Sequence, residues 1–195
     1  GNFPYAAPSY HLNRDDAEGR WWGFEGRLVS RAIAGQRWTL GFEYRDNLRQ
    51  NQKNADLGNR CYDSSLALLP GACLDSRVSS HLASLYAQDE ISLSRQTLLT
   101  AGLRFDHRSS GGGRWSPRLG LVWQPSAAHA VYVSASRSFQ PSGEGLALAA
   151  NNADLEPETS ALLETGYKGD WFDGRLGASA AVFRLERDHI KTADP

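Results

Sequence analysis

The 195-residue sequence predicts an all-β fold: an antiparallel up-and-down transmembrane β-barrel segment of about eight strands. Three observations predict it. Apolar and polar residues alternate with period two along eight stretches, most of them about as long as a tilted membrane-spanning strand. The connections between these stretches alternate between tight turns and longer loops, in the order short, long, short, medium, short, long, short. No stretch approaches the roughly 18 consecutive apolar residues of a transmembrane helix, an argument that does not exclude a barrel, whose strands show only weak alternation.

The predicted strands follow the alternation of side chains. Trp38, Leu40 and Phe42 share one face of a strand, and Thr39 and Glu43 lie on the other. The same pattern predicts strands at residues 20–31, 37–47, 81–94, 97–107, 114–124, 130–139, 160–172 and 175–187.

The connections between these strands are sorted by length. In an antiparallel meander, alternate turns lie at the same end of the sheet, so the tight turns gather at one end. Residues 48–79 and 141–159 then form long loops at the other end. A soluble β-sandwich has no reason to sort its loops, whereas an outer-membrane barrel has short periplasmic turns and long extracellular loops.

One face of the predicted strands carries charges that a dry core would not accept, because a buried unpaired charge costs several kcal/mol. A water-filled lumen accommodates them. The alternative is the solvated face of an open antiparallel sheet, and the sorting of the loops favours the lumen. The charged residues are Glu25, Arg27, Glu43, Arg45, Arg104, Asp106, Arg118, Glu164 and Lys168. Aromatic residues near strand ends are expected in interfacial girdles, namely Trp21, Trp38, Trp115, Tyr132 and Trp171.

The two cysteines, Cys61 and Cys73, lie in a polar segment and predict a disulfide. Chain-entropy arithmetic gives such a short loop roughly 3 kcal/mol of stabilisation, and the bond requires an oxidising compartment. The alternative is a pair of free thiols in a cytosolic protein. No second Cys/His pair has the spacing of zinc ligands, so no metal site is predicted.

Charge and motifs argue against two classes of function. A net charge of −1 gives no indication of a nucleic-acid partner. The sequence contains no His-Glu-x-x-His, Gly-x-Ser-x-Gly or Walker motif, and its histidines are scattered. We therefore expect neither an enzyme nor a bound cofactor.

Two segments resemble TonB-dependent outer-membrane siderophore receptors. SPRLGLVWQP with VYVSASRSFQPS, in residues 116–142, resembles their mid-barrel hairpin. Residues 155–195 resemble the loop and hairpin that follow, and the segment SGEGLALAANNADLEPE is similar to the catecholate-type members. The positions that match the family pattern are Leu155, Pro157, Glu158, Ser160, Glu164, Gly166, Lys168, Phe183 and Ile190.

The resemblance implies a barrel of 22 strands around a plug domain, in the outer membrane of a Gram-negative bacterium. Residues 1–195 are then expected to be an internal part of the barrel domain, without the plug domain or either end of the barrel. The implied function is TonB-dependent uptake of a ferric siderophore, with this piece forming barrel wall and extracellular loops. The implied partners are the ferric siderophore, outer-membrane lipid, and the TonB complex through an N-terminal region outside this chain.

Four cations are expected on the lumen side, where they would attract an anionic ferric complex: Arg104, Arg118, Arg137 and Lys168. The alternative role for them is salt bridging with the plug or with neighbouring strands. The loops at residues 48–79 and 140–159 are the candidates for direct ligand contact.

Other functions remain open from the sequence. The first is a complete small eight-stranded outer-membrane barrel with a structural or adhesive role. An outer-membrane enzyme barrel would need a Ser/His or Asp/His constellation near one rim, and none is convincing. A soluble β-sandwich is disfavoured by the sorting of the loops.

Overall fold

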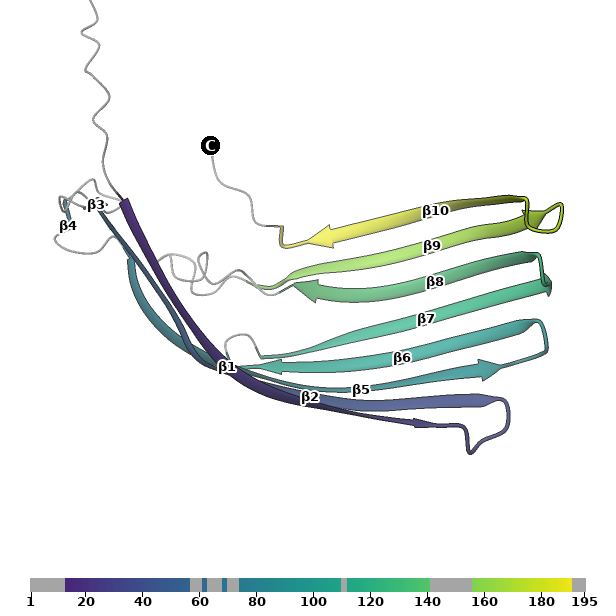
Figure 1. The fold of residues 1–195 in the computed structure, drawn as a ribbon, viewed down its shortest axis with the longest axis horizontal. Helices are drawn as coiled ribbons and strands as arrows, with labels where there is room; N and C mark the ends of the chain where they lie inside the picture. Colours follow the sequence, from purple (N-terminus) through teal and green to yellow (C-terminus); the bar gives the residue numbers. More distant parts are fainter. Residues whose placement is uncertain are drawn as a thin grey trace, which may run out of the picture. The chain divides into compact units, whose positions relative to one another are not determined.

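The computed structural model describes residues 13–56, 61–62, 68–69, 74–109, 112–140 and 156–190. Eight strands form one sheet in the order β1-β2-β5-β6-β7-β8-β9-β10, so each long strand lies beside its neighbours in the chain (Figure 1). They are β1 (Asn13–Ser30), β2 (Gln36–Asp56), β5 (Leu74–Ser92), β6 (Thr97–Arg108), β7 (Gly112–Ser126), β8 (His129–Gln140), β9 (Glu158–Trp171) and β10 (Leu176–Asp188). The two-residue strands β3 (Cys61–Tyr62) and β4 (Leu68–Leu69) pair with each other. The all-β, up-and-down prediction is confirmed.

Each of the eight predicted stretches corresponds to one long strand, and the tight turns lie where they were predicted. Between β9 and β10 the chain reverses at Asp173-Gly174, and both residues have positive φ angles of 53° and 80°. Glycine adopts this backbone conformation without the steric penalty that a Cβ would bring. The two edges of the sheet are β1 and β10, so the sheet is open.

Three strands are at least five residues longer than predicted. β1, β2 and β5 have 18, 21 and 19 residues, whereas a tilted strand spans the hydrocarbon layer with about 9–11. The extra residues lie at the ends away from the tight turns, and they include much of the segment 48–79 that was predicted as a loop. Polar residues on both faces of these extensions remove the hydrophobic alternation from which a strand is recognised.

The chain divides into two compact units, one formed by residues 1–22 and 46–80 and the other by residues 23–45 and 81–195. In the first unit the strands are joined by polar side chains. Arg49 donates a 2.6 Å hydrogen bond to Glu18, and Ser80 links Asn47 to Gln50 at 3.0 and 2.6 Å. The Arg49 guanidinium lowers the pKa of the Glu18 carboxyl below its ordinary value.

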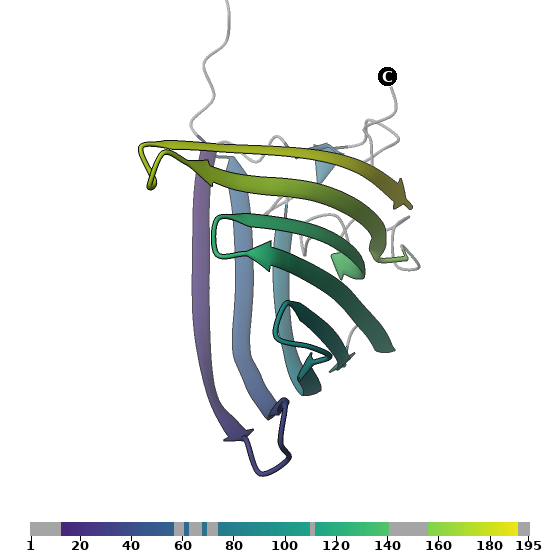
Figure 2. The same ribbon diagram turned by 90° about the vertical axis from the view of Figure 1, so that its right-hand side faces the viewer.

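The second unit contains a single layer of strands with two different faces, and Figure 2 shows β6–β10 side by side in this layer. The pairing places Leu99, Leu121 and Val133 in one row across β6, β7 and β8. In the adjacent row, Thr100 is opposite Gly120, which is opposite Ser134. We call these the apolar face and the polar face.

Large apolar side chains on this sheet are exposed. Among the residues that the structure describes, only one hydrophobic residue, Leu82, is buried. Residues of the apolar face such as Leu119 and Val182 have exposed fractions of 52% and 74%. An apolar surface of this extent requires apolar surroundings, which a lipid bilayer supplies. No helix in the described part of the chain has the length and apolarity needed to cross a membrane.

Candidate functional site

The polar face holds a partly buried ion-pair network, which we call the Arg104 cluster. The Nε of Arg104 donates to both carboxylate oxygens of Asp106, at 2.8 and 3.0 Å. Its Nη2 donates to Glu43 at 2.8 Å and to Ser84 at 2.9 Å, and Ser84 Oγ donates to Asp106 at 2.5 Å. Asp106 and Ser84 are buried, whereas Arg104 and Glu43 are partly exposed. The cluster ties β2, β5 and β6 together.

Strand geometry explains why these residues meet. Arg104 and Asp106 are two residues apart on β6, so their side chains share a face. Ser84 pairs directly with Asp106, and Tyr86 pairs with Arg104. The Tyr86 ring lies over Gly41 of β2, where a Cβ would come within 2.1 Å of the ring. The guanidinium carbon of Arg104 is 5.8 Å from the centre of this ring, within cation–π range.

A second polar cluster lies on β8 and β9. The hydroxyl of Tyr132 donates a 2.6 Å hydrogen bond to Glu164, and the Lys168 ammonium is 5.9 Å from the centre of the Tyr132 ring. Tyr132 pairs with Gly166, and a Cβ at Gly166 would come within 2.5 Å of the ring. Only glycine therefore allows the tyrosine to lie flat across the neighbouring strand.

The structure places three of the four predicted cations on one face of the sheet and the fourth on the other. Arg104, Arg118 and Lys168 lie on the polar face, as expected. Arg118 pairs with Ser136 and forms no ion pair with any residue that the structure describes. The three cations of the polar face lie on β6, β7 and β9 at separate positions in the pairing and do not converge on one site.

Arg137 is on the opposite face. It follows Val131, Val133 and Ala135 at two-residue intervals on β8, and it pairs with Ala161 of β9. Its expected position in the lumen is therefore wrong. The charge suggested the lumen, but the parity along the strand, which decides the face, puts Arg137 among apolar residues.

Two further expectations concern parts outside the described side chains. Cys61 is described only as a backbone position of β3, and Cys73 lies outside the described residues, so their disulfide remains a prediction. Residues 141–155, which make up most of the second predicted ligand loop, also lie outside. Within the described ranges, no three His, Cys, Asp or Glu residues are arranged to hold a metal ion.

Aromatic residues mark the tight-turn end of the apolar face. The rings of His129 and Tyr167 stack at 6.0 Å, and Trp171 lies 5.5 Å from His129. These rings are typical of an interfacial girdle. Tyr132, which was also expected in a girdle, lies instead on the polar face with Glu164.

Comparison with known proteins identifies the family. The family model for the β-barrel of TonB-dependent receptors matches residues 1–195. The chain belongs to the TonB-dependent receptor family. It is a segment of the receptor barrel, in the outer membrane of Gram-negative bacteria, and the receptors of this family are transporters. The apolar face is accordingly the lipid side of the barrel wall, and the polar face is its lumen side.

Two of the relatives are named as receptors for metal-bound ligands. The chain is 32% identical over 130 residues to the metal-pseudopaline receptor CntO of Pseudomonas aeruginosa, covering 57% of this chain and 18% of that protein. It is 38% identical over 90 residues to the ferric enterobactin receptor of the same species, covering 44% of this chain and 11% of the relative. The chain thus spans less than a fifth of the length of either relative.

Solved structures agree on the fold. A crystal structure of a variant of the ferric enterobactin receptor PfeA of Pseudomonas aeruginosa matches 90% of this chain, and 27% of its own, with a TM-score of 0.62 and 27% identity. The siderophore receptor PirA of Pseudomonas aeruginosa matches 89% of this chain and 32% of its own, with a TM-score of 0.64. At 23% identity, PirA supports the fold alone.

Proposed function

We propose that the protein containing this sequence takes up a ferric siderophore through the outer membrane, powered by the TonB complex. Residues 1–195 form part of its barrel domain and contribute wall and extracellular loops. The observation that carries this proposal is the match of the whole chain to the receptor barrel, together with relatives named as siderophore and metallophore receptors.

The lumen side of the wall supplies electrostatic attraction. Arg118 has no ion-pair partner in the described part of the chain, and Lys168 is held over the ring of Tyr132. These two cations are available to an anionic ferric complex. Arg104 is already matched by Glu43 and Asp106, so it stabilises the wall rather than binding ligand. Arg137, on the lipid side, takes no part in ligand attraction.

The ligand class that we favour is a ferric catecholate. One of the relatives is a ferric enterobactin receptor, and so is one of the matching structures. A ferric tris-catecholate is strongly anionic, which suits a lumen wall with unpaired cations. Cations in such a channel raise the local concentration of an anionic ligand and its association rate, and salt screens the effect.

Uptake of labelled iron by cells that express the full-length receptor tests the proposal. Ferric enterobactin, ferric pyoverdine and metal-loaded pseudopaline are supplied separately to a strain without its own receptors. We expect uptake of ferric enterobactin that requires both the receptor and TonB. Uptake of none of the three chelates, or uptake that persists without TonB, would overturn the proposal.

A pair of variants tests the role of the lumen cations. Arg118→Gln with Lys168→Gln should slow uptake several-fold at low ionic strength and less at high ionic strength. Arg95→Gln with Arg175→Gln removes the same two positive charges from exposed tight turns and should leave uptake unchanged. Equal effects of the two changes would exclude a specific role for the lumen cations.

A further inference from the structure

Lys168 does not pair with the carboxylate that lies nearest to it on its own strand. Lys168 and Asp170 are two residues apart on β9, so their side chains share the lumen face. Both residues are described, and no ion pair or hydrogen bond joins them. The residues opposite Lys168 are Ala130 on β8 and Ser179 on β10, which carry no charge. The ammonium group therefore has one adjacent counter-ion on this face and does not contact it.

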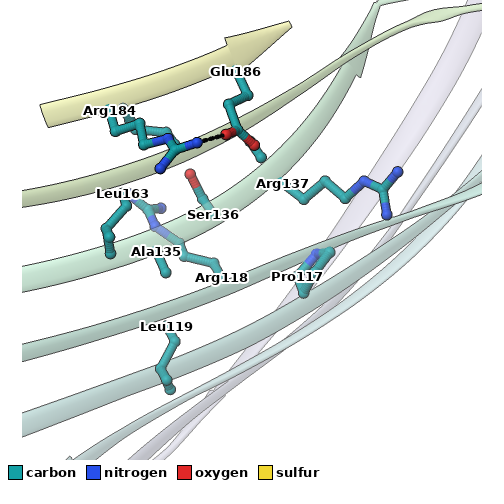
Figure 3. Close-up of a pocket in the computed structure, with 11 residues that line it drawn as sticks. Pro117, Arg118, Leu119, Ala135, Ser136, Arg137, Leu163, Arg184 and Glu186 are labelled. Carbon is teal, nitrogen blue, oxygen red and sulfur yellow. Dashed lines mark hydrogen bonds and ion pairs between the residues drawn. The ribbon is translucent and has the colours of Figure 1, made fainter. Parts of the chain in front are cut away.

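Charged residues with the same spacing do pair on neighbouring strands of this sheet. Arg104 and Asp106 of β6 form an ion pair at 2.8 Å. Arg184 and Glu186 of β10 form another, which is drawn in Figure 3. Two residues along a strand are thus a separation that a basic and an acidic side chain can bridge in this wall. The unpaired lysine on β9 requires a separate cause.

The ring of Tyr132 supplies this cause. Tyr132 pairs with Gly166, which is two residues from Lys168 in the direction away from Asp170. The ammonium of Lys168 is 5.9 Å from the centre of this ring, within cation–π range. The ring itself is fixed, because its hydroxyl donates to Glu164 at 2.6 Å and its edge lies over the bare backbone of Gly166. At exposed sites a cation–π contact and an ion pair are of similar strength, so the ring competes with the carboxylate for the ammonium.

We propose that Tyr132 is a positioning residue for ligand attraction, because it holds the Lys168 ammonium away from Asp170 and keeps its charge available to an anion in the lumen. The inference rests on the proposed function, in which lumen cations attract the ferric complex. Lys168 is three residues from the tight-turn end of β9, whereas Arg118 is eight residues from that end of β7. The two cations act at different depths of the passage, and an ion pair with Asp170 would neutralise the one near the periplasmic end.

Zero-length cross-linking of the full-length receptor in detergent tests the position of Lys168 without any chelate. A carbodiimide activates a carboxylate, an amine in contact with it displaces the activating group to form an amide, and peptide mass spectrometry locates that amide. We expect the Lys168–Asp170 amide to be at least about threefold more abundant in Tyr132→Leu than in the unchanged receptor. Tyr132→Phe keeps the ring and should give as little amide as the unchanged receptor. Gly166→Ala displaces the ring without removing it and should also increase the amide.

Uptake of ferric enterobactin tests the consequence for ligand attraction. Tyr132→Leu should slow uptake several-fold at low ionic strength, and adding Asp170→Asn should restore most of the rate. A purely structural role of the tyrosine would not allow this rescue.

Three results would overturn the proposal: equal amounts of the amide in the unchanged receptor and in Tyr132→Leu, as much amide in Tyr132→Phe as in Tyr132→Leu, or no rescue by Asp170→Asn. Failure of the proposed function has a different signature, namely no uptake by the unchanged receptor. The cross-linking result decides the position of Lys168 in either case.

Discussion

Replacing Arg104 by methionine is expected to destabilise the barrel wall, because it leaves Asp106 buried without its counter-ion. Asp106 is only 7% exposed and accepts two hydrogen bonds from Arg104 Nε and one from Ser84. Methionine keeps much of the length of the arginine stem, so the change removes the charge and its hydrogen bonds with little loss of packing. In the variant, Ser84 remains the one partner of this carboxylate within the cluster.

The size of the effect follows from burial. Breaking a buried ion pair by removing one partner costs about 3–5 kcal/mol. Arg104 and Glu43 are about one-third exposed, at 34% and 35% of their side-chain surface, so solvent screens part of the interaction. We therefore expect Arg104→Met to lower the free energy of unfolding by about 2–4 kcal/mol. Glu43→Gln, which breaks the more exposed bond, should cost only about 0.5–1 kcal/mol.

Guanidinium unfolding of the full-length receptor, followed by tryptophan fluorescence in detergent micelles, measures these differences. Arg118→Met is the matched control, since Arg118 lies on the same face and forms no ion pair with a described residue. Its loss should cost less than about 0.5 kcal/mol. A double-mutant cycle with Asp106→Asn should return a coupling energy of about 1–3 kcal/mol. The reasoning is refuted if Arg104→Met costs no more than the Arg118 control, or if the coupling energy is near zero.

Three further changes have defined outcomes in the same unfolding assay. Gly166→Ala should cost about 1–3 kcal/mol, because its Cβ would displace the Tyr132 ring. At the control position, Gly120→Ala, the nearest atom to the new Cβ is 4.0 Å away, and the change should cost less than about 1 kcal/mol. Equal costs would show that the Tyr132 ring does not obstruct a side chain at position 166. Asp89→Ala should stabilise the receptor by about 1–3 kcal/mol, because Oδ1 of this buried carboxylate has no hydrogen-bond partner among the residues that the structure describes. A loss of stability would show that the carboxylate has a partner. The lowered pKa of Glu18 means that its ion pair stabilises the protein above the unfolded-state pKa and loses this contribution as the pH falls through the folded-state pKa. The stability difference between the receptor and Glu18→Gln should accordingly disappear in acid, and a difference that persists there would exclude the ionic cause.

The period-two alternation predicted the membrane-spanning parts of the strands well, because one face meets lipid and the other meets water. Residues 37–47 were predicted as a strand, and β2 begins one residue earlier, at Gln36. The same strand continues to Asp56, where the alternation is lost. Both faces of this extension are polar, so strand pairing there depends on contacts such as Arg49 with Glu18, and a single sequence does not reveal such long-range pairs.

The candidate site was predicted only in part. The charged face was recognised, but the Arg104 cluster joins Glu43 and Arg104 across 61 positions of sequence and depends on the order of β2, β5 and β6. Composition and spacing do not determine that pairing. The wrong prediction for Arg137 has another cause, because the sequence alone could have corrected it. Val131, Val133 and Ala135 precede Arg137 at two-residue intervals, and this alternation assigns Arg137 to the lipid side.

Both lumen clusters contain the same arrangement of a glycine, a tyrosine and a cation. This arrangement explains how the cation is held on a water-facing wall. Tyr86 lies over Gly41 and contacts Arg104, and Tyr132 lies over Gly166 and contacts Lys168. In each case the missing Cβ lets an aromatic ring lie across the neighbouring strand, and the ring then supports a cation. Each tyrosine contacts the glycine of the neighbouring strand on one side and a cation on the other, so both side chains are restricted before any ligand binds. Under the proposed function, Gly166 therefore contributes to ligand attraction through Tyr132 and Lys168, whereas Gly41 contributes to the Arg104 cluster that stabilises the wall.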